Sequence, residues 1–243
     1  MSIALITGSG VRLGKALAIS FAQKGWDIVL HYNQSKQKAE EAAEQVLSFG
    51  VNAYLYQADL LNSKEIEVLF QTLKSKEIIP DLLINNAGIF PGKTALENLD
   101  EMMWDEVLGV NLKAQYLCSK EFIKIQKGHG RIINIASVGA FGAWNGRLAY
   151  NVSKAGVIRL TKALAKELAP NVLVNCICPG SIDFPEERTE ADKSIISTER
   201  IPARRLAKPE DICEAAYFFA NCNDYITGQY LIVDGGYTLS IEN

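Results

Sequence analysis

Short runs rich in β-branched residues alternate with longer stretches of helical periodicity along the chain, and this alternation limits the possible folds more than any other feature. The runs predicted to be strands are 3–7, 28–32, 52–58, 81–85, 131–136, 172–178 and 230–234. Helical periodicity occupies the segments 13–25, 35–50, 62–75, 100–126, 149–169 and 209–222. Several strands lack alternation of apolar and polar residues, as strands covered by helices on both faces do. The sequence therefore predicts an α/β fold with a doubly wound sheet of about seven parallel strands.

Composition excludes several classes of partner. Lys and Arg number 25 against 28 Asp and Glu, a net charge of −3, so no basic surplus indicates binding to nucleic acid or to an anionic membrane. No apolar run approaches the roughly 18 residues that cross a bilayer, and no charged leader precedes the first glycines. The five cysteines lack a C-x-x-C pair, which suits reduced thiols rather than a metal site. We therefore expect a cytoplasmic protein with a small-molecule partner.

No internal repeat, low-complexity tract or linker divides the chain, so we expect one domain over residues 1–243. The irregular stretch 181–211 is rich in charges, contains three prolines and follows the sixth predicted strand. Ligands of open α/β sheets bind beyond the carboxyl ends of the strands, so this stretch is predicted to cover a substrate site. A solvated loop with no part in binding is the alternative.

The octapeptide TGSGVRLG, residues 7–14, connects the first predicted strand to the first predicted helix. Gly8, Gly10 and Gly14 allow the backbone to approach a pyrophosphate closely, and the positive end of the helix dipole faces that charge. The second interval between glycines is one residue longer than in the common dinucleotide-binding fingerprint. The motif and its position predict a Rossmann-type fold that binds a dinucleotide.

The end of the second predicted strand indicates which dinucleotide is bound. NAD-binding proteins usually present an acidic residue there to the ribose hydroxyls, but residues 28–39 contain none. Side chains that suit a 2′-phosphate stand there instead: His31, Asn33, Ser35 and Lys36. Arg12 is a further candidate, and a charge-assisted hydrogen bond of roughly 1.5–3 kcal/mol would favour the phosphorylated cofactor about ten- to a hundredfold. We therefore expect NADPH rather than NADH, unless Arg12 is only an exposed residue at the helix start.

A second motif, YNVSK, places Tyr150 and Lys154 four residues apart on a predicted helix, so their side chains share one face. Ser137 ends the fifth predicted strand and INNAG, residues 84–88, ends the fourth. A phenol with a pKa near 10 must fall by roughly 3 pH units, about 4 kcal/mol, to exchange protons near neutrality, and an adjacent ammonium supplies such a field. We expect Tyr150 to protonate a carbonyl oxygen during hydride transfer. Lys154 would lower the phenol pKa and hold the nicotinamide ribose, while Ser137 would fix the carbonyl.

A series of motifs in order resembles the short-chain dehydrogenase/reductase family over nearly the whole chain. They are TGSGVRLG, Asp59 in QADL, NNAG, Asn111 in GVNL, Ser137, Tyr150 with Lys154, CPG, and YITGQYLIVDGGY. The resemblance implies that Asp59 hydrogen-bonds the adenine, that Asn111 anchors a water in a proton relay with Lys154, and that subunits form homotetramers through long helices. It also implies cofactor contacts from residues in or beside the motifs: Leu13, Leu60, Asn86, Ala87, Gly88, Pro179, Gly180 and Ile182.

One branch of the family shares three features with the first half of the chain. Arg12 where glycine is common, the start of HYNQS, and Phe90 just after NNAG resemble the pteridine reductases. In that branch the arginine contacts cofactor phosphate and substrate, and the aromatic ring stacks on the pterin. Those enzymes often carry Asp in place of Ser137, whereas this chain keeps the serine.

The segment KGHGRIINIAS, the serine and tyrosine motifs and the C-terminal segment resemble another branch, the 3-oxoacyl-acyl-carrier-protein reductases. The basic docking residues of that group are replaced here by Gly128 and by Pro170 and Asn171, which leaves Lys127 as the nearby cation. An acyl carrier protein is therefore a weakened but retained candidate partner.

Three aromatic residues are candidates for substrate contact. Phe90 follows NNAG, and Phe141 and Trp144 stand between the serine and tyrosine motifs; packing against the core is the alternative for each. Together the patterns predict an NADPH-dependent oxidoreductase that reduces a carbonyl of the 3-oxoacyl type or of a small ketone. Pteridine reduction is the second hypothesis. A non-catalytic dinucleotide-sensing protein is the third, because a fold does not dictate function.

Overall fold

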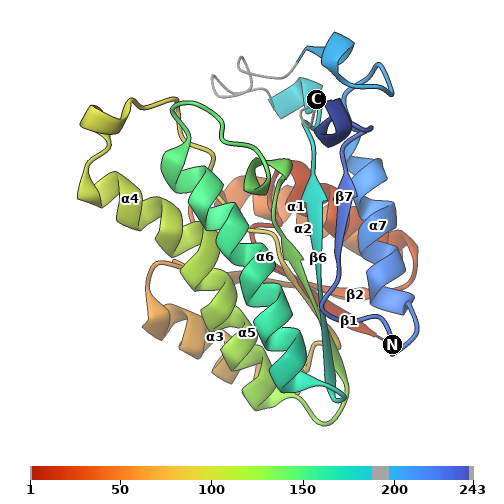
Figure 1. Ribbon diagram of the computed structural model, residues 1–243. Helices are drawn as coiled ribbons and strands as arrows, with labels where there is room; N and C mark the ends of the chain where they lie inside the picture. The colour runs from red at the N-terminus through yellow and green to blue at the C-terminus, as the bar shows by residue number, and fades with distance from the viewer. Residues whose placement is uncertain (1, 188–196, 241–243) are drawn as a thin grey trace.

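The computed structural model describes residues 2–187 and 197–240. Its centre is a sheet of seven parallel strands in the order β3-β2-β1-β4-β5-β6-β7 (Figure 1). The strands are β1 (Ile3–Ile6), β2 (Asp27–Tyr32), β3 (Ala53–Gln57), β4 (Leu82–Asn85), β5 (Gly130–Ile135), β6 (Val172–Pro179) and β7 (Tyr230–Val233). Each overlaps one predicted strand, so the parallel, doubly wound sheet expected from the sequence is confirmed.

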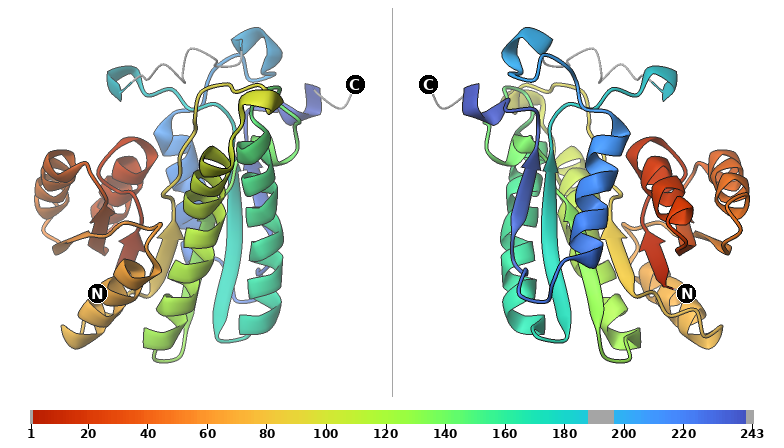
Figure 2. Two further views of the ribbon diagram at one scale, coloured as in Figure 1. Left: turned by 90° about the vertical axis from the view of Figure 1, so that its left-hand side faces the viewer. Right: turned by 90° about the vertical axis from the view of Figure 1, so that its right-hand side faces the viewer.

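Helices cover both faces of the sheet. The α-helices are α1 (Arg12–Gln23), α2 (Lys36–Leu47), α3 (Ser63–Ser75), α4 (Glu101–Leu108), α5 (Ala114–Ile125), α6 (Leu148–Leu168) and α7 (Pro209–Asn221). As Figure 2 shows, α1, α2 and α7 lie on one face and α3 to α6 on the other. A separate apolar core fills each side, one built around Phe21 and Ile28 and the other around Phe70 and Phe122. Burial on both faces explains why several strand sequences lack alternation of apolar and polar residues.

The predicted helical stretch 100–126 is interrupted. A π-helical turn, Gly109–Lys113, separates α4 from α5. The sequence pattern alone predicts one continuous helix, because a π-turn adds only one residue to the helical period. Such turns are frequent at functional sites, and Asn111 lies within this one.

The strand order reverses between β1 and β4, and this reversal brings two loops together at the carboxyl edge of the sheet. The amide of Thr7 donates to the carbonyl of Ile84 at 3.0 Å. The Thr7 hydroxyl accepts hydrogen bonds from the amides of Asn86 at 2.9 Å and Ala87 at 3.0 Å. The glycine loop after β1 and the NNAG loop after β4 are thereby joined at the position where doubly wound sheets form their ligand crevice.

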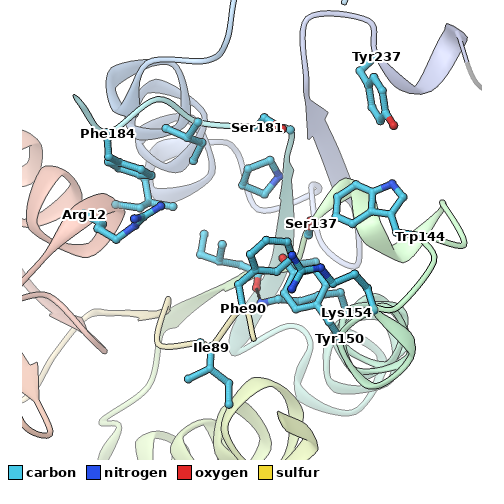
Figure 3. Close-up of a pocket in the computed structure, with 18 of the residues that line it drawn as sticks. Arg12, Ile89, Phe90, Ser137, Trp144, Tyr150, Lys154, Ser181, Phe184 and Tyr237 are labelled. Carbon is cyan, nitrogen blue, oxygen red and sulfur yellow. Dashed lines mark hydrogen bonds between the residues drawn. The ribbon is translucent and has the colours of Figure 1, made fainter. Parts of the chain in front are cut away.

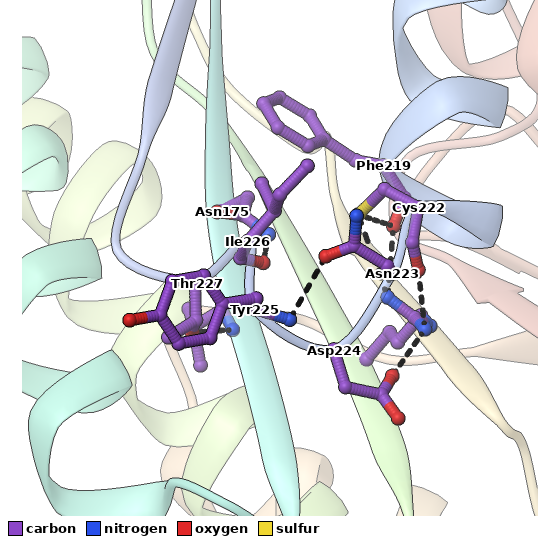
Figure 4. A network of polar contacts seen from close by, with 10 residues as sticks. Asn175, Phe219, Cys222, Asn223, Asp224, Tyr225, Ile226 and Thr227 are labelled. Atoms are coloured by element: carbon purple, nitrogen blue, oxygen red, sulfur yellow. Dashed lines mark hydrogen bonds and ion pairs between the residues drawn. The ribbon is translucent and has the colours of Figure 1, made fainter.

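A polar network fixes the turn between α7 and β7 (Figure 4). Asn175 on β6 donates a hydrogen bond to the carbonyl of Ile226 at 2.9 Å. Arg131 on β5 donates to the carbonyl of Cys222 at 2.8 Å and pairs with Asp224 at 2.9 Å. Buried amides are costly to leave without partners, so these contacts stabilise the entry of the chain into the edge strand β7.

The described parts of the stretch 181–211 lie at the carboxyl edge of the sheet. Ile182 and Ala207 form an isolated bridge, and short 3-10 turns occur at Pro185–Glu187 and Thr198–Arg200. Residues 188–196, in the middle of the predicted cover, lie outside the described residues. All five cysteines are buried and free, as expected. Within the described ranges, no helix combines the length and the apolar character needed to cross a bilayer.

Candidate active site

A cavity of about 590 Å³ lies at the carboxyl edge of the sheet, and Figure 3 shows part of its lining. Strand ends, the NNAG loop, the start of α6 and the described ends of the covering stretch form its wall. Twelve of the residues singled out from the sequence line it: Arg12, Leu13, Asn86, Gly88, Phe90, Ser137, Trp144, Tyr150, Lys154, Pro179, Gly180 and Ile182. Parallel strands end at one edge, and this is why segments distant in sequence meet there.

Tyr150, Lys154 and Ser137 lie close together in this cavity (Figure 3). The Lys154 ammonium is 5.8 Å from the centre of the Tyr150 ring, one helical turn away on α6. Lys154 is buried and donates a hydrogen bond to the carbonyl of Ile135, the last residue of β5, at 3.0 Å. The Ser137 hydroxyl accepts from the amide of Gly139 at 3.1 Å. A helix and a strand end thus hold the three side chains in fixed positions.

The pKa of Tyr150 shifts in the opposite direction to the one expected from the sequence. Burial raises the pKa of Tyr150 above its ordinary value, while the hydrogen bond to Ser137 and the positive charge of Arg147 act in the opposite direction. Burial also lowers the pKa of Lys154 to about 8. The protein's own residues therefore keep the phenol protonated at neutral pH, which suits a group that must give up a proton.

Asn111 is fully buried beneath the NNAG loop. Its side-chain oxygen accepts from the amide of Ile89 at 2.8 Å, and its side-chain nitrogen donates to the carbonyl of Ile89 at 3.0 Å. The same nitrogen donates to the hydroxyl of Ser153 on α6 at 3.2 Å. Through this one side chain, the π-turn fixes the loop after β4 against α6.

The glycine loop fits a bound pyrophosphate. Gly8 has a φ of +64°, a conformation that favours glycine. A Cβ atom at Gly14 would lie 2.0 Å from the carbonyl oxygen of Gly8, so only glycine lets the first turn of α1 pack against the loop. At the N-terminus of α1, the amide of Arg12 donates to the carboxylate of Glu187 at 2.9 Å. A carboxylate already uses the positive end of the helix, and a phosphate offers the same charge and acceptor atoms.

His31 does not lie where the sequence suggested. The ring is buried, its Nδ1 accepts from the amide of Gly8 at 3.0 Å, and its Nε2 lies 3.0 Å from the carbonyl oxygen of Ala58. Because Nδ1 accepts, Nε2 carries the proton and donates. Burial lowers the pKa of the imidazole to about 4. The expected contact between His31 and a 2′-phosphate is therefore wrong, since the neutral ring supports the glycine loop from inside.

The other residues expected near a 2′-phosphate and adenine are not among the residues that line the cavity. Asn33 is exposed and donates to Asp59 at 3.3 Å. The hydroxyl of Ser35 would lie 3.1 Å from a Cβ atom at Gly10, so the start of α2 closes on the glycine loop. Leu60 is buried. Contact of Asn33 and Ser35 with a nucleotide at the end of β2 stays a prediction.

Arg12 has a φ of +50°, in the left-handed region where glycine is favoured. Its guanidinium packs over the ring of Phe184 at 4.4 Å and donates to the carbonyl of Glu187 at 2.9 Å. Figure 3 shows Arg12 and Phe184 together on one side of the cavity. The side chain is directed under the covering stretch, so in this orientation it does not extend toward the end of β2.

Two of the three aromatic candidates line the cavity. The ring of Phe90 meets that of Tyr150 edge-on at 4.7 Å, and Trp144 lies parallel to Tyr150 at 6.3 Å. The expectation for Phe141 is wrong. The 3-10 turn Val138–Ala140 leads Phe141 away from the cavity, and its ring packs on Tyr230 of β7 at 5.5 Å.

Several charged and aromatic lining residues were not predicted: Lys93, Arg147, Phe184, Arg200 and Tyr237. Arg147 immediately precedes α6 and lies outside the predicted helical stretch 149–169, so no helical spacing indicated that it lines the cavity. The others belong to loops or short turns, where no periodic pattern indicates which side chains face a cavity.

Comparison with known proteins extends over nearly the whole chain. A family model described as Enoyl-(Acyl carrier protein) reductase matches residues 10–238. A 3-oxoacyl-[acyl-carrier-protein] reductase from Synechocystis sp. is 36% identical over 239 residues, and one from Staphylococcus aureus is 35% identical over 240 residues. Each alignment covers 96% of this chain and 96% of the relative.

Solved structures show the same architecture. Acetoin dehydrogenase YohF from Salmonella typhimurium has a TM-score of 0.87 at 32% identity and is matched over 98% of this chain and 96% of its own. A variant of a short-chain dehydrogenase/reductase from Serratia marcescens has a TM-score of 0.89 at 28% identity over 98% of both chains. These matches all indicate one family. The sheet order, the glycine loop and the tyrosine and lysine on α6 agree with it. The chain belongs to the short-chain dehydrogenase/reductase family of oxidoreductases.

Proposed function

We propose that the protein is an NADPH-dependent reductase that acts on a carbonyl of the 3-oxoacyl type or of a small ketone, with Tyr150 as the proton donor. The observation that carries this proposal is the meeting of Tyr150, Ser137 and Lys154 in one cavity that continues to the glycine loop. Acid–base groups and an anion-binding loop side by side suit a reaction between a dinucleotide and a second, smaller molecule.

The bound dihydronicotinamide would supply the hydride that adds to the carbonyl carbon. The Tyr150 hydroxyl donates its proton to the carbonyl oxygen as negative charge develops there, and the hydroxyl of Ser137 donates a hydrogen bond to the same oxygen. The Lys154 ammonium binds the ribose hydroxyls of the cofactor and favours the phenolate that remains after proton transfer. Asn111 holds the NNAG loop against α6 during the transfer of hydride and proton.

Binding of the cofactor is proposed to use the glycine loop for the pyrophosphate and the end of β2 for the adenosine ribose. Asn33 and Ser35 would donate to a 2′-phosphate, and Asp59 would accept from the adenine. The lack of an acidic residue in 28–39 supports NADPH over NADH. Ala87, Pro179 and related loop residues would line the nicotinamide end.

The curated relatives described above carry the name 3-oxoacyl-[acyl-carrier-protein] reductase, and this supports a 3-oxoacyl thioester as one substrate class. An acyl carrier protein would then be the partner, with Lys127 as the cation nearest to the docking position. We further propose a single-domain, cytoplasmic enzyme that assembles as a homotetramer.

A second candidate function, reduction of a pteridine, is favoured by Phe90. Its ring lines the cavity beside Tyr150 instead of packing in the core. A flat heterocycle could stack on it, although the guanidinium of Arg147 already lies 4.0 Å from its centre. Two substrates separate the candidates: an acetoacetyl thioester and a dihydropterin, each followed by the loss of NADPH absorbance. Turnover of the dihydropterin alone would reject the 3-oxoacyl assignment.

Substitution Tyr150→Phe tests the mechanism itself. It removes the proton donor and keeps the ring, so we expect kcat to fall about 10²–10⁴-fold. Binding of NADPH, measured by fluorescence titration, should change little, because the phenyl ring retains its packing against Phe90. Unchanged turnover would reject the proposed role of Tyr150. A dinucleotide sensor would instead show no NADPH oxidation by the wild-type protein with any carbonyl.

A further inference from the structure

The covering stretch places an anion at the N-terminus of α1. One carboxylate oxygen of Glu187 accepts a hydrogen bond from the amide of Arg12, the first residue of the helix, at 2.9 Å. The helix start supplies no such acceptor itself, because Val11, its N-cap residue, has an apolar side chain and the first turn contains no acidic residue. Glu187 lies 175 residues further along the chain, so this contact closes the covering stretch onto the glycine loop.

Further contacts hold this end of the covering stretch against α1. The guanidinium of Arg12 donates to the backbone carbonyl of Glu187 at 2.9 Å and packs over the ring of Phe184 at 4.4 Å (Figure 3). Within the 3-10 turn Pro185–Glu187, the amide of Glu187 donates to the carbonyl of Phe184 at 3.0 Å. The turn therefore presents the Glu187 carboxylate to the helix end as part of a set of contacts.

The covering stretch is held separately at its base. Ile182 and Ala207 form an isolated bridge. The amide of Asp183 donates to the carbonyl of Ala207 at 2.9 Å, and the amide of Ala207 donates to the carbonyl of Ser181 at 3.0 Å. These contacts involve no residue of α1. The end that carries Glu187 can therefore leave the helix while the base stays in place.

A dinucleotide would use the same end of α1. The cavity lining includes Arg12 and Leu13 of the first helical turn and Phe184 of the covering stretch. A helix N-terminus attracts a pyrophosphate, but each backbone amide has only one hydrogen to donate. Two anions held at one helix end also repel each other, most strongly where water is partly excluded. The Glu187 carboxylate and a bound pyrophosphate therefore exclude each other at this position.

We propose that Glu187 is an internal competitor of the cofactor: its carboxylate occupies the pyrophosphate position at α1 and must leave before a dinucleotide binds. This inference rests on the proposed function, because it takes the glycine loop as the site of the pyrophosphate. The covering stretch thereby regulates cofactor affinity. Because both dinucleotides contain the pyrophosphate, Glu187 weakens the binding of NADPH and of NADH by the same factor.

Equilibrium binding to the full chain gives the first test. Glu187→Gln keeps the size of the side chain and removes its charge. Fluorescence titration with NADPH should give a Kd about two- to thirtyfold below that of the wild type, the range expected for a carboxylate at a helix N-terminus. Titration with NADH should show the same factor. Glu186→Gln removes the same charge from the neighbouring exposed residue and should leave both constants near their wild-type values, because salt screens exposed charges.

Binding rates distinguish competition from repulsion within the complex. A competitor reduces the fraction of molecules that can accept the cofactor, and the apparent association rate falls with that fraction. In stopped-flow measurements, Glu187→Gln should increase the association rate constant for NADPH by the same factor as the affinity. The dissociation rate constant should stay unchanged. A gain in affinity that came only from slower dissociation would overturn the proposal.

Thermal unfolding checks that the variant does not simply fold better. Without dinucleotide, Glu187→Gln should unfold at a midpoint no higher than that of the wild type, because it has lost a contact with α1. At a fixed concentration of NADPH, the rise in its midpoint should exceed the rise in the wild type, since tighter binding stabilises the folded chain more. A higher midpoint without dinucleotide would assign the tighter binding to the fold and overturn the proposal.

None of these measurements uses a ketone, so they separate this inference from the proposed function. Tighter and faster binding by Glu187→Gln, together with no ketone reduction by the wild type, would reject the reductase and keep the competitor. Equal Kd values in the wild type and Glu187→Gln would overturn the competitor while the reductase assignment stands. A gain shared by Glu186→Gln, or confined to NADPH, would also overturn it, because the cause would be overall charge or the 2′-phosphate. Failure of every form to bind either dinucleotide would reject both.

Discussion

At the scale of single residues, His31 links the stability of the glycine loop to pH. The buried ring accepts from the amide of Gly8 and has a pKa of about 4, whereas an unfolded histidine has a pKa near 6.5. Between these values the unfolded chain binds more protons than the folded chain, so the free energy of unfolding increases with pH in this window. From pH 7 to pH 5, His31 should therefore lower the stability by about 2 kcal/mol.

Urea unfolding at pH 7 and pH 5 measures this effect. His31→Gln should be less stable than the wild type at pH 7 but should lose about 2 kcal/mol less on going to pH 5. The chain contains only one other histidine, His129, which is exposed. His129→Gln is therefore the matched control and should keep the pH dependence of the wild type. An unchanged pH dependence in His31→Gln would show that the buried ring does not titrate as described.

The choice of cofactor is tested at the end of β2. Ser35→Asp places a carboxylate beside the glycine loop, where it would repel a 2′-phosphate and accept from ribose hydroxyls. We expect the ratio of kcat/KM for NADPH to that for NADH to fall about ten- to a hundredfold. Ser48→Asp, at the other end of α2, adds the same charge away from the loop and should leave the ratio unchanged. A ratio that does not move in Ser35→Asp would contradict the proposed phosphate position.

Individual side chains could be predicted from the sequence where a rigid spacing fixed their direction. Tyr150 and Lys154 are four residues apart on a helix, and both line the cavity as that spacing requires. His31 could not be placed in the same way, because a strand buried on both faces does not reveal whether a polar residue points outward. Phe141 follows a 3-10 turn, whose direction depends on packing that no local pattern records.

At the scale of elements, the junction of β1, the glycine loop and α1 depends on Gly14. A Cβ atom there would lie 2.0 Å from the carbonyl oxygen of Gly8 and 2.6 Å from the side-chain nitrogen of Asn86. Gly14→Ala must therefore displace the loop or the first turn of α1. We expect a loss of about 1–3 kcal/mol in stability, as for other overpacked sites, and at least a tenfold loss in NADPH affinity by fluorescence titration.

Gly92→Ala provides the control for that substitution. A Cβ atom at Gly92 meets nothing within 4 Å, and its φ lies outside the left-handed region. Both the unfolding midpoint and the NADPH affinity should stay near the wild-type values. If Gly14→Ala bound NADPH as tightly as Gly92→Ala does, the close approach of α1 to the glycine loop would not be required for cofactor binding.

Most helices and strands could be predicted from the sequence, because the pattern of apolar residues that marks each one is regular over its length. Every predicted strand overlaps an observed one, and most helix boundaries differ by only a few residues. The exception is the helical stretch 100–126, where the π-turn holds Asn111 against Ile89. Its existence depends on a hydrogen-bonded contact with a loop more than twenty residues away, and helical periodicity contains no information on such contacts.

At the scale of the whole molecule, the parallel order of the sheet predicts where the site lies. In a parallel sheet, every loop that follows a strand begins at the same carboxyl edge. The glycine loop and the loop after β4 therefore had to meet once β1 and β4 were known to be neighbours. The side chains that line the cavity could not be predicted to the same extent. Phe184 and Arg200 come from the covering stretch, whose path follows from tertiary packing alone.

Two exposed apolar surfaces give the molecule a route to the proposed tetramer. The first, the helix face, has Met102 on α4, Tyr116 on α5 and Val152 on α6; α4 and α5 follow one another along the chain, and α6 runs beside them in Figure 2. The second, the β7 edge, has Tyr230 and Leu231 on the last strand of the sheet. Contiguous apolar surfaces and uncovered edge strands are typical of interfaces. Two different self-complementary interfaces on one chain generate a tetramer with three twofold axes.

Light scattering coupled to size-exclusion chromatography tests this assembly. The wild type should have four times the 26.7-kDa mass of the chain. Tyr116→Glu buries a charge in the helix face and Leu231→Glu does so in the β7 edge, so each should leave one interface and yield dimers, and the double variant should yield monomers. Leu47→Glu alters an exposed leucine on α2 that belongs to neither surface and should remain tetrameric. A wild-type monomer at micromolar concentration would refute the assembly, and dissociation of Leu47→Glu would show that these two surfaces are not the interfaces.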